Sequence, residues 1–353
     1  MTRAIKPAFL VTVDTEGDDL WGRPREIATR NVAWLPRFQA LCEHHGLRPT
    51  WLVDYEMALD DAFVAFGREV LRRNAGEIGM HLHAWNTPPL VPVTADDFRH
   101  QPYLTDYPQE VAREKIAVVT QLLRERFETR ITSHRGGRWA FDANIARALA
   151  DEGYQVDCSV CPHVSWAGMK GDPAGPGGPD FRRFPDHPYR LDLDRIDRRG
   201  DSHLLEVPMS VLRSRLHRIA PWAYVTPLLR RFAWSRGPDR LWLYPDGRND
   251  GVVQAVLDEA LASGRPYVEM VLHSSELMPG GSPSTPDEAS AERLFAQLEA
   301  LFSRAQASFQ GMTLTEFRHA WVAGAFAAAA SAPSRTSRPR PAPVGSVARG
   351  KAP

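Results

Sequence analysis

Segments with strand character and segments with helix character alternate along most of this chain, and this alternation restricts the fold more than any other feature. Short apolar runs predict seven strands, at residues 9–13, 50–54, 77–82, 130–134, 154–160, 204–209 and 267–273. Amphipathic stretches predict helices at residues 31–45, 62–74, 109–127, 142–152, 251–263 and 287–307. Repeated β/α units build a parallel sheet with helices outside it. We therefore expect an α/β fold, a distorted (β/α)7-type barrel in a single domain.

Composition and chain length set the expected domain organisation. The chain has 353 residues, 43% of them hydrophobic, which is enough for one large core. We expect one barrel domain over residues 1–325 and a basic Pro/Ala/Ser/Arg tail over residues 326–353. The last 23 residues carry five basic side chains and no acidic one, and they lack the apolar residues that would repay ordering, so we expect disorder there. The Gly- and Pro-rich stretch 166–199 predicts a long irregular loop of the kind that shapes substrate clefts.

Several classes of partner and location are excluded or favoured by the same composition. The formal net charge is zero, so the body without its basic tail is mildly acidic, and we expect no nucleic-acid partner. Three cysteines are too few for a disulfide framework and the chain reaches a strand without an apolar signal segment, so we expect a cytoplasmic protein. Cys158 and Cys161 form a CxxC that runs from a strand into a loop, whereas a redox motif begins a helix. The weakly polar run 321–332 is shorter than the ~20 residues of a membrane span, so we expect none.

Two pairs of polar residues stand near the ends of two predicted strands, each with the spacing i, i+2. Asp14 and Glu16 follow the first strand, and His81 and His83 lie at the end of the third. Because alternate side chains of a strand share a face, each pair projects together, near the carboxyl end where parallel sheets carry their sites. Two imidazoles and one carboxylate leave an open position on a zinc-type ion, and the second carboxylate can take a proton from bound water. Either pair alone also fits a solvated turn or surface histidines, but together they favour a metal-dependent hydrolase.

Two further residues lie at predicted strand ends. Arg135, in SHRGGRW, follows the fourth strand, and its guanidinium could hold a carboxylate ionised and oriented. His273 ends the last strand, and since the first and last strands of a closed barrel are neighbours, we expect it to face Asp14. Alone, each fits a structural role, as a surface salt-bridge residue or a buried histidine. Their shared position at strand ends favours a role in the site.

Motifs in the right order make the chain resemble the polysaccharide deacetylases of the NodB-homology type, carbohydrate esterase family four, and most closely their WalW-like branch. TVDTEGD resembles the family's Thr-x-Asp-x-Asp/Glu strand end, and EIGMH its lead into the metal histidines. SHRGGRW stands where the family has Arg-x-Pro-Tyr, and MVLHSSEL where it has its terminal Leu-His. The resemblance covers residues 8–318. It implies that Asp14 is the catalytic base, Arg135 keeps Asp14 ionised and aimed, and His273 protonates the departing amine.

The chain departs from the family pattern at three points. The family's second metal histidine follows the first by four residues, where this chain has Trp85, so His83 is expected to substitute, with Asn86 as the alternative partner. The family's Pro-Tyr after the arginine is absent, and Arg138 stands there, near the backbone amide that the family uses to stabilise an oxyanion. The Asp that tunes the family's last histidine has no clear counterpart, and Asp246 in LWLYPDG is the candidate.

The resemblance implies a hydrolase that removes an N-acetyl or other N-acyl group from a sugar in a polysaccharide or lipopolysaccharide precursor and releases acetate. It implies a divalent metal, zinc by preference, with ligands Glu16, His81 and His83. The expected substrate-binding residues are Trp85, Asn86, Arg138 and Trp139. Hydrolysis of a non-sugar amide or formamide on the same fold stays open, as does a carbohydrate-binding member without turnover. A glycosyltransferase that binds metal through Asp-x-Glu would leave the two histidines unexplained.

Overall fold

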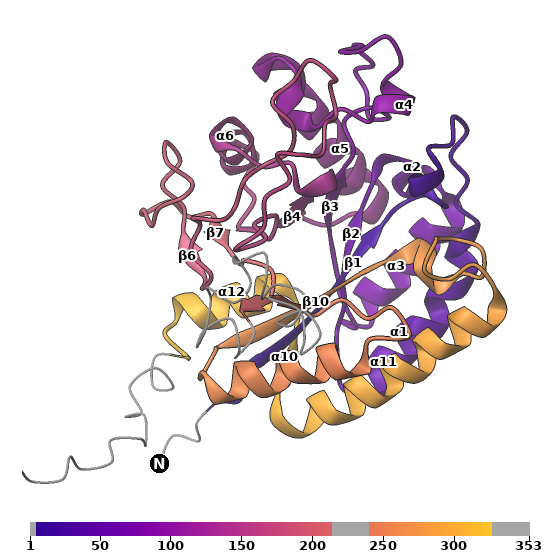
Figure 1. The fold of residues 1–353 in the computed structure, drawn as a ribbon, viewed down its shortest axis with the longest axis vertical. Helices are drawn as coiled ribbons and strands as arrows, with labels where there is room; N and C mark the ends of the chain where they lie inside the picture. Colours follow the sequence, from indigo (N-terminus) through magenta and orange to yellow (C-terminus); the bar gives the residue numbers. More distant parts are fainter. Residues whose placement is uncertain (1–4, 214–239, 327–353) are drawn as a thin grey trace, which may run out of the picture.

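The computed structural model describes residues 5–213 and 240–326, and one curled sheet lies at its centre (Figure 1). Seven strands of this sheet run parallel in the order β10-β1-β2-β3-β4-β5-β7. Each overlaps one of the predicted runs, so the distorted (β/α)7-type barrel in a single domain is confirmed. The strands are β1 (Ala8–Thr15), β2 (Thr50–Val53), β3 (Glu77–Leu82), β4 (Ser133–Gly136), β5 (Val156–Asp157), β7 (Leu205–Glu206) and β10 (Tyr267–His273).

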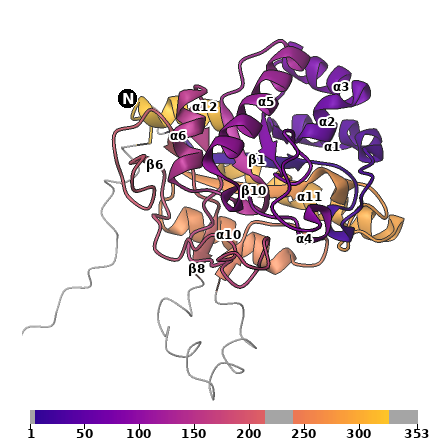
Figure 2. The same cartoon turned by 90° about the horizontal axis from the view of Figure 1, so that it is seen from above.

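Helices form the outer layer and surround the sheet when it is seen from above (Figure 2). Asp60, Asp142 and Asp287 each begin a helix by accepting a hydrogen bond from a main-chain N–H of its first turn. The first helix begins at Leu35, four residues later than predicted, because residues 30–34 form a 3₁₀ turn before it. The six predicted helices are α1 (Leu35–His44), α3 (Asp61–Arg72), α5 (Gln109–Phe127), α6 (Ala143–Asp151), α10 (Asp250–Ala262) and α11 (Glu288–Ser308).

Strand β1 is buried on both faces, which positions the polar end of the barrel. Phe9 and Val13 belong to the main apolar core, whereas Ala8 and Leu10, on the opposite face, belong to a smaller cluster with Phe317. Phe317 comes from α12 (Leu314–Val322), which therefore closes the end of the barrel where the strands begin. The opposite end, where the strands finish, is left for polar side chains.

The barrel is not closed by a continuous ladder of main-chain hydrogen bonds. Within the described residues β7 and β10 are the two ends of the parallel run, and the contacts between them are individual bonds. The main-chain N–H of Glu269 donates to Ser210 Oγ at 2.8 Å, and the Tyr267 hydroxyl donates to the carbonyl oxygen of Pro208. Pro208 follows β7 closely and has no N–H, so it cannot donate to a main-chain ladder between β7 and β10.

Several short elements were not predicted, because two to five residues carry too little periodicity. Two of them, β8 (Val211–Arg213) and β9 (Arg240–Trp242), pair antiparallel in a separate small sheet. The others are the helices α2 (Tyr55–Leu59) and α4 (Asp97–His100), the strands β6 (Tyr189–Arg190) and β11 (Gln310–Met312), and the 3₁₀ helices Leu20–Gly22, Arg30–Trp34, Leu104–Asp106, Gly137–Trp139 and Ser274–Leu277.

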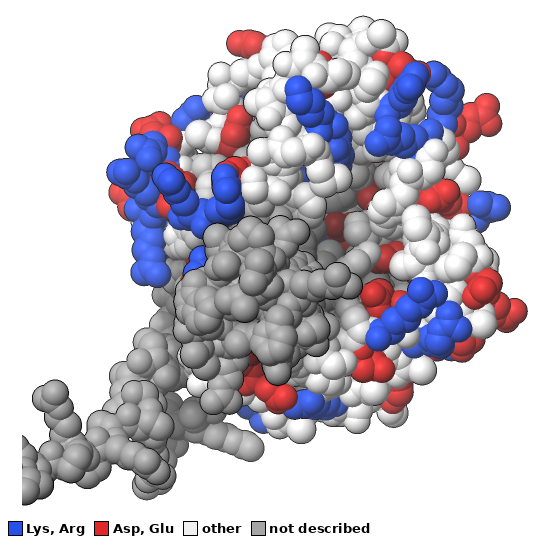
Figure 3. All heavy atoms as spheres, viewed as in Figure 1, with Lys and Arg blue, Asp and Glu red and all other residues white. Residues whose placement is uncertain are grey.

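Three sequence predictions concern the cysteines, the membrane and the tail. Cys158 and Cys161 are buried free thiols, and burial raises the pKa of each, which does not suit a redox pair. Across residues 5–213 and 240–326 there is no helix with the length and apolar character that a bilayer crossing requires. The expected tail lies outside the described residues apart from Phe326. The face drawn in Figure 3 carries acidic and basic side chains interspersed.

Candidate active site

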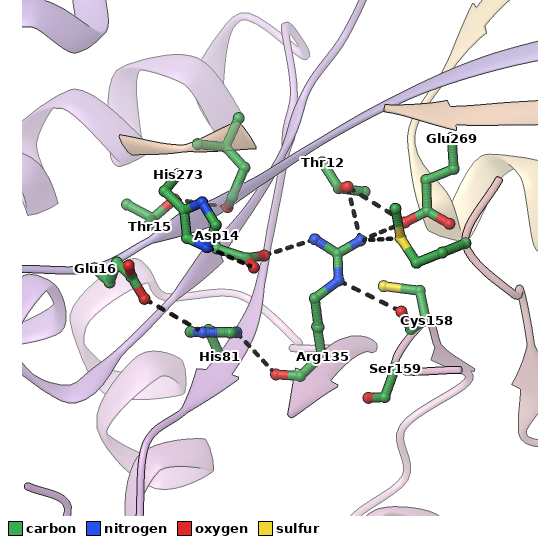
Figure 4. Close-up of polar contacts among 12 residues, drawn as sticks. Thr12, Asp14, Thr15, Glu16, His81, Arg135, Cys158, Ser159, Glu269 and His273 are labelled. Atoms are coloured by element: carbon green, nitrogen blue, oxygen red, sulfur yellow. Dashed lines mark hydrogen bonds and ion pairs between the residues drawn. The ribbon is translucent and has the colours of Figure 1, made fainter. Parts of the chain in front are cut away.

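The polar residues singled out in the sequence meet where four parallel strands end. Asp14 on β1 is the register partner of His273 on β10, and His81 on β3 is the partner of Arg135 on β4. The expected proximity of Asp14 and His273 is therefore confirmed. Glu16 lies just beyond the end of β1 on the same side, and Figure 4 shows these side chains converging.

Glu16, His81 and His83 form a compact, buried group of metal-ligand type. Glu16 Oε2 lies 2.8 Å from His83 Nε2 and 3.6 Å from His81 Nε2, and the two Nε2 atoms are 3.2 Å apart. His81 Nδ1 lies 3.0 Å from the carbonyl oxygen of Arg135. A carbonyl oxygen only accepts, so Nδ1 is the donor, and the lone pair of neutral His81 is on Nε2. One carboxylate oxygen and two imidazole nitrogens thus gather at one point, which is a donor set that suits a divalent ion.

The protonation states of this group follow from burial and from neighbouring charges. Burial opposes ionisation of Glu16, but His273, His81 and His83 hold its pKa far below the usual range. Burial lowers the pKa of His83. Burial also opposes the charge of His81, but Asp14 and Glu16 raise its pKa. An ionised carboxylate is therefore next to a neutral imidazole, and a cation bound here would compete with the proton on His81.

Asp14 is held by a fully buried arginine. Arg135 Nη1 donates to Asp14 Oδ1 at 2.6 Å, and Nη2 donates to Glu269 Oε1 at 2.5 Å and to Thr12 Oγ1 at 2.7 Å. Burial favours the neutral form of Asp14, but Arg135 outweighs it and lowers the pKa of Asp14. Thr12 and Glu269 were missed in the sequence. The available signal was a Glu in the otherwise apolar strand YVEMVLH, on the same alternate face as His273.

His273 is oriented by Glu276, three residues further along the chain. Glu276 Oε2 lies 3.2 Å from His273 Nδ1 and also accepts from the main-chain N–H of His273 at 2.9 Å. Asp246, the candidate from the sequence, instead accepts from the main-chain N–H of Arg248, so that prediction was wrong. The Nε2 atom of His273 lies 3.8 Å from Asp14 Oδ2. Burial opposes protonation of His273, but Glu16 and Glu276 raise its pKa to about 9.

Two more carboxyl groups lie near the metal-ligand group, Asp54, which is buried, and Glu56, which is half-buried. Asp54 begins α2 and also accepts from the main-chain N–H of Gly17 at 3.3 Å. Burial, with a contribution from Glu16, raises the pKa of Asp54 to about 7. Burial and Asp54 raise the pKa of Glu56 to about 9. Asn86 Nδ2 donates to Glu56 Oε2 at 2.8 Å, so Asn86 is directed to Glu56 and is not among the residues that line the pocket described next.

A pocket of about 320 Å³ opens above the polar group. Three of the four expected substrate-binding residues line it, Trp85, Arg138 and Trp139, together with Trp166 and Met169 from the predicted cleft-shaping loop. The remaining lining residues include Asp14, Glu16, His81, His83 and His273 of the polar group and Leu20, Trp21, Arg23, Gln101, Tyr103 and Gly136.

Gly137 leaves room for the imidazole ring of His83. A Cβ atom at residue 137 would lie 2.5 Å from the carbonyl oxygen of Leu82 and 2.6 Å from His83 Nδ1. Only glycine avoids both contacts without a shift of the chain. The close approach of His83 thus explains why residue 137 is a glycine.

The fold and the polar strand ends define a class of protein, a (β/α)7-type barrel with an acidic and histidine-rich site at the carboxyl end of its sheet. No family model matches the chain, and no curated protein matches it by sequence.

Solved structures share this architecture at low sequence identity. A candidate polysaccharide deacetylase from Mycobacterium smegmatis is 14% identical, with a TM-score of 0.51 over 96% of this chain and 97% of that one. A candidate glycoside hydrolase/deacetylase from Parabacteroides distasonis is also 14% identical, with a TM-score of 0.58 over 91% of this chain and 73% of that one. At this identity the similarity establishes the fold.

Proposed function

We propose that this protein is a metal-dependent hydrolase that removes an N-acetyl or other N-acyl group from a sugar and releases acetate or the corresponding acid. The observation that carries the proposal is the convergence of Glu16, His81 and His83, whose Oε2 and Nε2 atoms lie 2.8 to 3.6 Å from one another, beside Asp14 and His273. The low-identity structural neighbours include proteins named as deacetylases, which agrees with this chemistry.

The proposed metal ligands are Glu16, His81 and His83, and zinc is the proposed ion. The donor set fits, because His81 Nδ1 is occupied by the carbonyl oxygen of Arg135 and Nε2 is left for coordination. A bound divalent ion would lower the pKa of a water molecule and polarise the acyl carbonyl group. Asn86 is not proposed as a ligand, since it is not among the residues that line the pocket.

Asp14 is the proposed general base. Arg135 binds Asp14 Oδ1 and keeps the carboxylate ionised, while Oδ2 is directed towards His273. An ionised carboxylate at this place can accept the proton of an attacking water molecule. Because Arg135 is completely buried and bonded on both sides, it holds Asp14 in one orientation.

His273 is the proposed general acid. Hydrogen bonding to Glu276 fixes its ring, and its raised pKa keeps it protonated at neutral pH. A protonated imidazole that lines the same pocket as the base can donate its Nε2 proton to the departing amine. The products are a carboxylic acid and a free amine, which balances the addition of one water molecule.

A sugar is the proposed substrate because aromatic rings surround the polar floor of the pocket. Trp85 and Trp139 line the pocket, together with Trp21 and Trp166, and such rings offer flat apolar faces to a pyranose. We also propose that the sugar belongs to a precursor of a polysaccharide or lipopolysaccharide. The protein is further proposed to belong to the WalW-like branch and to act in the cytoplasm. The division into a barrel over residues 1–325 and a tail over 326–353 also stays a prediction.

Elemental analysis combined with acetate release tests the function. The wild-type protein is expected to bind about one equivalent of zinc and to release acetate from N-acetylated sugar oligomers. His81→Ala and His83→Ala should each lose metal and activity together, whereas His203→Ala, which alters an exposed histidine, should lose neither. Absence of metal after reconstitution would overturn the mechanism. Metal and sugar binding without acid release would favour a binding protein, and release from non-sugar amides alone would favour the amidase alternative.

A further inference from the structure

Two arginines line the candidate active-site pocket without an acidic partner. Arg23 and Arg138 both contribute to its wall, although they are far apart in the sequence. Among residues 5–213 and 240–326 no carboxylate forms an ion pair with either. Arg135, at the floor of the same site, by contrast binds two carboxylates. The two wall arginines therefore bring positive charge to the pocket that the described protein does not neutralise by direct pairing.

The same turn of the chain anchors both guanidinium groups. Arg23 Nη1 donates to the carbonyl oxygen of Arg99 at 2.7 Å, and Arg138 Nη1 donates to that of Gln101. Arg99 and Gln101 lie at the end of α4, where helical carbonyl groups are unsatisfied and attract cations. Arg138 also stacks on the ring of Tyr103, with 4.0 Å between the guanidinium carbon and the ring centroid. The two cations are thus fixed on one side of the pocket.

Holding these cations together opposes the stability of the protein alone. Burial lowers the pKa of Arg138, and the charge of Arg23 adds to this lowering, whereas Tyr103 and Asp106 oppose it. In addition, both residues have left-handed backbone conformations, with φ of 55° at Arg23 and 55° at Arg138. Such conformations are unfavourable for residues other than glycine and are concentrated at functional sites. An anion between the guanidinium groups would relieve the repulsion.

The hydrogen-bonding capacity of the pair suits an anion with several oxygens. A guanidinium has five N–H donors, and Arg23 makes one side-chain hydrogen bond, to Arg99, within the described residues. Its remaining donors can form the forked contact that arginine makes with carboxylate and phosphate groups. Asp14 and Glu16, which would repel an anion, are at the floor, where Arg135 and the histidines balance their charge.

We infer that the substrate of this site carries an anionic group, a carboxylate or a phosphate, which Arg23 and Arg138 bind while the acyl group reaches Asp14 and the metal-ligand group. This inference rests on the proposed function and specifies its substrate class as acidic N-acylated sugars. The pocket holds the two polar regions apart, with the cations on the wall and the acidic group at the floor. A neutral N-acetylated sugar would leave the guanidinium groups uncompensated and bind less tightly.

Calorimetric titration tests the inference independently of turnover. The full chain carrying Asp14→Asn, loaded with one equivalent of zinc, is titrated with three probes: N-acetylglucosamine, N-acetylglucosamine 1-phosphate and 2-acetamido-2-deoxyglucuronate. The second variant adds Arg23→Gln. The matched control adds Arg25→Gln, which removes the same charge from the same segment but from an arginine that is paired with Asp96 and does not line the pocket. Thermal melting of each variant checks that it is folded.

We expect at least one anionic probe to bind about tenfold or more tightly than the neutral one, the range for one or two charge-assisted hydrogen bonds. Arg23→Gln should remove most of that difference and leave the neutral probe unchanged, and Arg25→Gln should not. The phosphate and uronate arms tell which anion is preferred. Equal affinity for all three probes, or equal effects of Arg23→Gln and Arg25→Gln, would overturn the inference. If the anionic probes bind selectively but wild-type protein releases no acid from them, the proposed hydrolase function fails and the anion site stands.

Discussion

Asp14 and Arg135 form a buried ion pair between β1 and β4, with 2.6 Å between Asp14 Oδ1 and Arg135 Nη1. The same guanidinium binds Glu269 on β10 at 2.5 Å. One cation therefore lies between two carboxyl groups from adjacent strands, in a place where solvent cannot screen its charge. Arg135 consequently has two roles that can be separated by experiment, one in the stability of the barrel and one in the ionisation of the candidate base.

Removing this cation should destabilise the fold strongly. In Arg135→Met both carboxylates stay buried without their partner, so the free energy of unfolding should fall by about 3–5 kcal/mol. Urea denaturation measures the change. The control is Arg113→Met, which breaks the exposed ion pair with Asp151 and should change the free energy of unfolding by less than about 1 kcal/mol. Equal losses in the two variants would show that the buried pair is not a special contributor.

The pH dependence of activity should report His273. A general acid must carry its proton, and the pKa of His273 is raised to about 9 because Glu16 and Glu276 outweigh its burial. Activity should therefore persist through neutral pH and fall as the pH rises towards 9, somewhat earlier with a metal bound, since the metal offsets the charge of Glu16. Glu276→Gln removes one anion and should move this alkaline limb to lower pH.

The profile of kcat/KM against pH measures the shift. Glu288→Gln, an exposed residue at the start of α11, serves as the control and should leave the limb in place. If the Glu276 variant loses activity by the same factor at every pH, Glu276 has only a structural role.

Metal affinity should fall as the pH is lowered. Although burial opposes its charge, Asp14 and Glu16 raise the pKa of His81, so this ligand takes up a proton at higher pH than an ordinary histidine. A bound cation must displace that proton. Zinc titrations in buffers of different ionisation enthalpy, at pH 8 and pH 6, should show proton release and at least tenfold weaker binding at the lower pH. An affinity that does not change with pH would contradict the assignment of His81 as a ligand.

Gly137 should be sensitive to the smallest possible enlargement. In Gly137→Ala the new methyl group meets Leu82 O at 2.5 Å and His83 Nδ1 at 2.6 Å, so His83 must move. We expect loss of zinc and a fall of about 1–3 kcal/mol in the free energy of unfolding. The control is Gly251→Ala on α10, where a Cβ meets nothing within 4 Å and the expected change is a gain of up to about 1 kcal/mol. Retention of zinc in Gly137→Ala would show that His83 is not a ligand.

The local sequence pattern was sufficient to predict an element where the element is long enough for its apolar positions to recur. Helix α5 has the bounds predicted for residues 109–127, since its apolar positions recur over several turns. By contrast, the predicted strand at 130–134 became β4 at Ser133–Gly136. The bounds of this strand were set by tertiary pairing, because Ser133 and His134 are matched to β5 across the sheet. Short strands depend on their partners more than on their own residues.

In the candidate site too, some features could be predicted from local pattern and others could not. The spacing of Asp14 with Glu16 and of His81 with His83 placed each pair on one face, and the alternation of strands and helices placed both near the same end of a barrel, because side-chain direction and strand direction are local properties of the chain. Only the tertiary structure decided that Glu276 rather than Asp246 binds His273, that Glu269 shares Arg135 with Asp14, and that Arg23 and Arg138 are held on one turn. These are contacts between residues whose separation in sequence carries no periodic signal, so they follow from packing and charge balance in the folded chain.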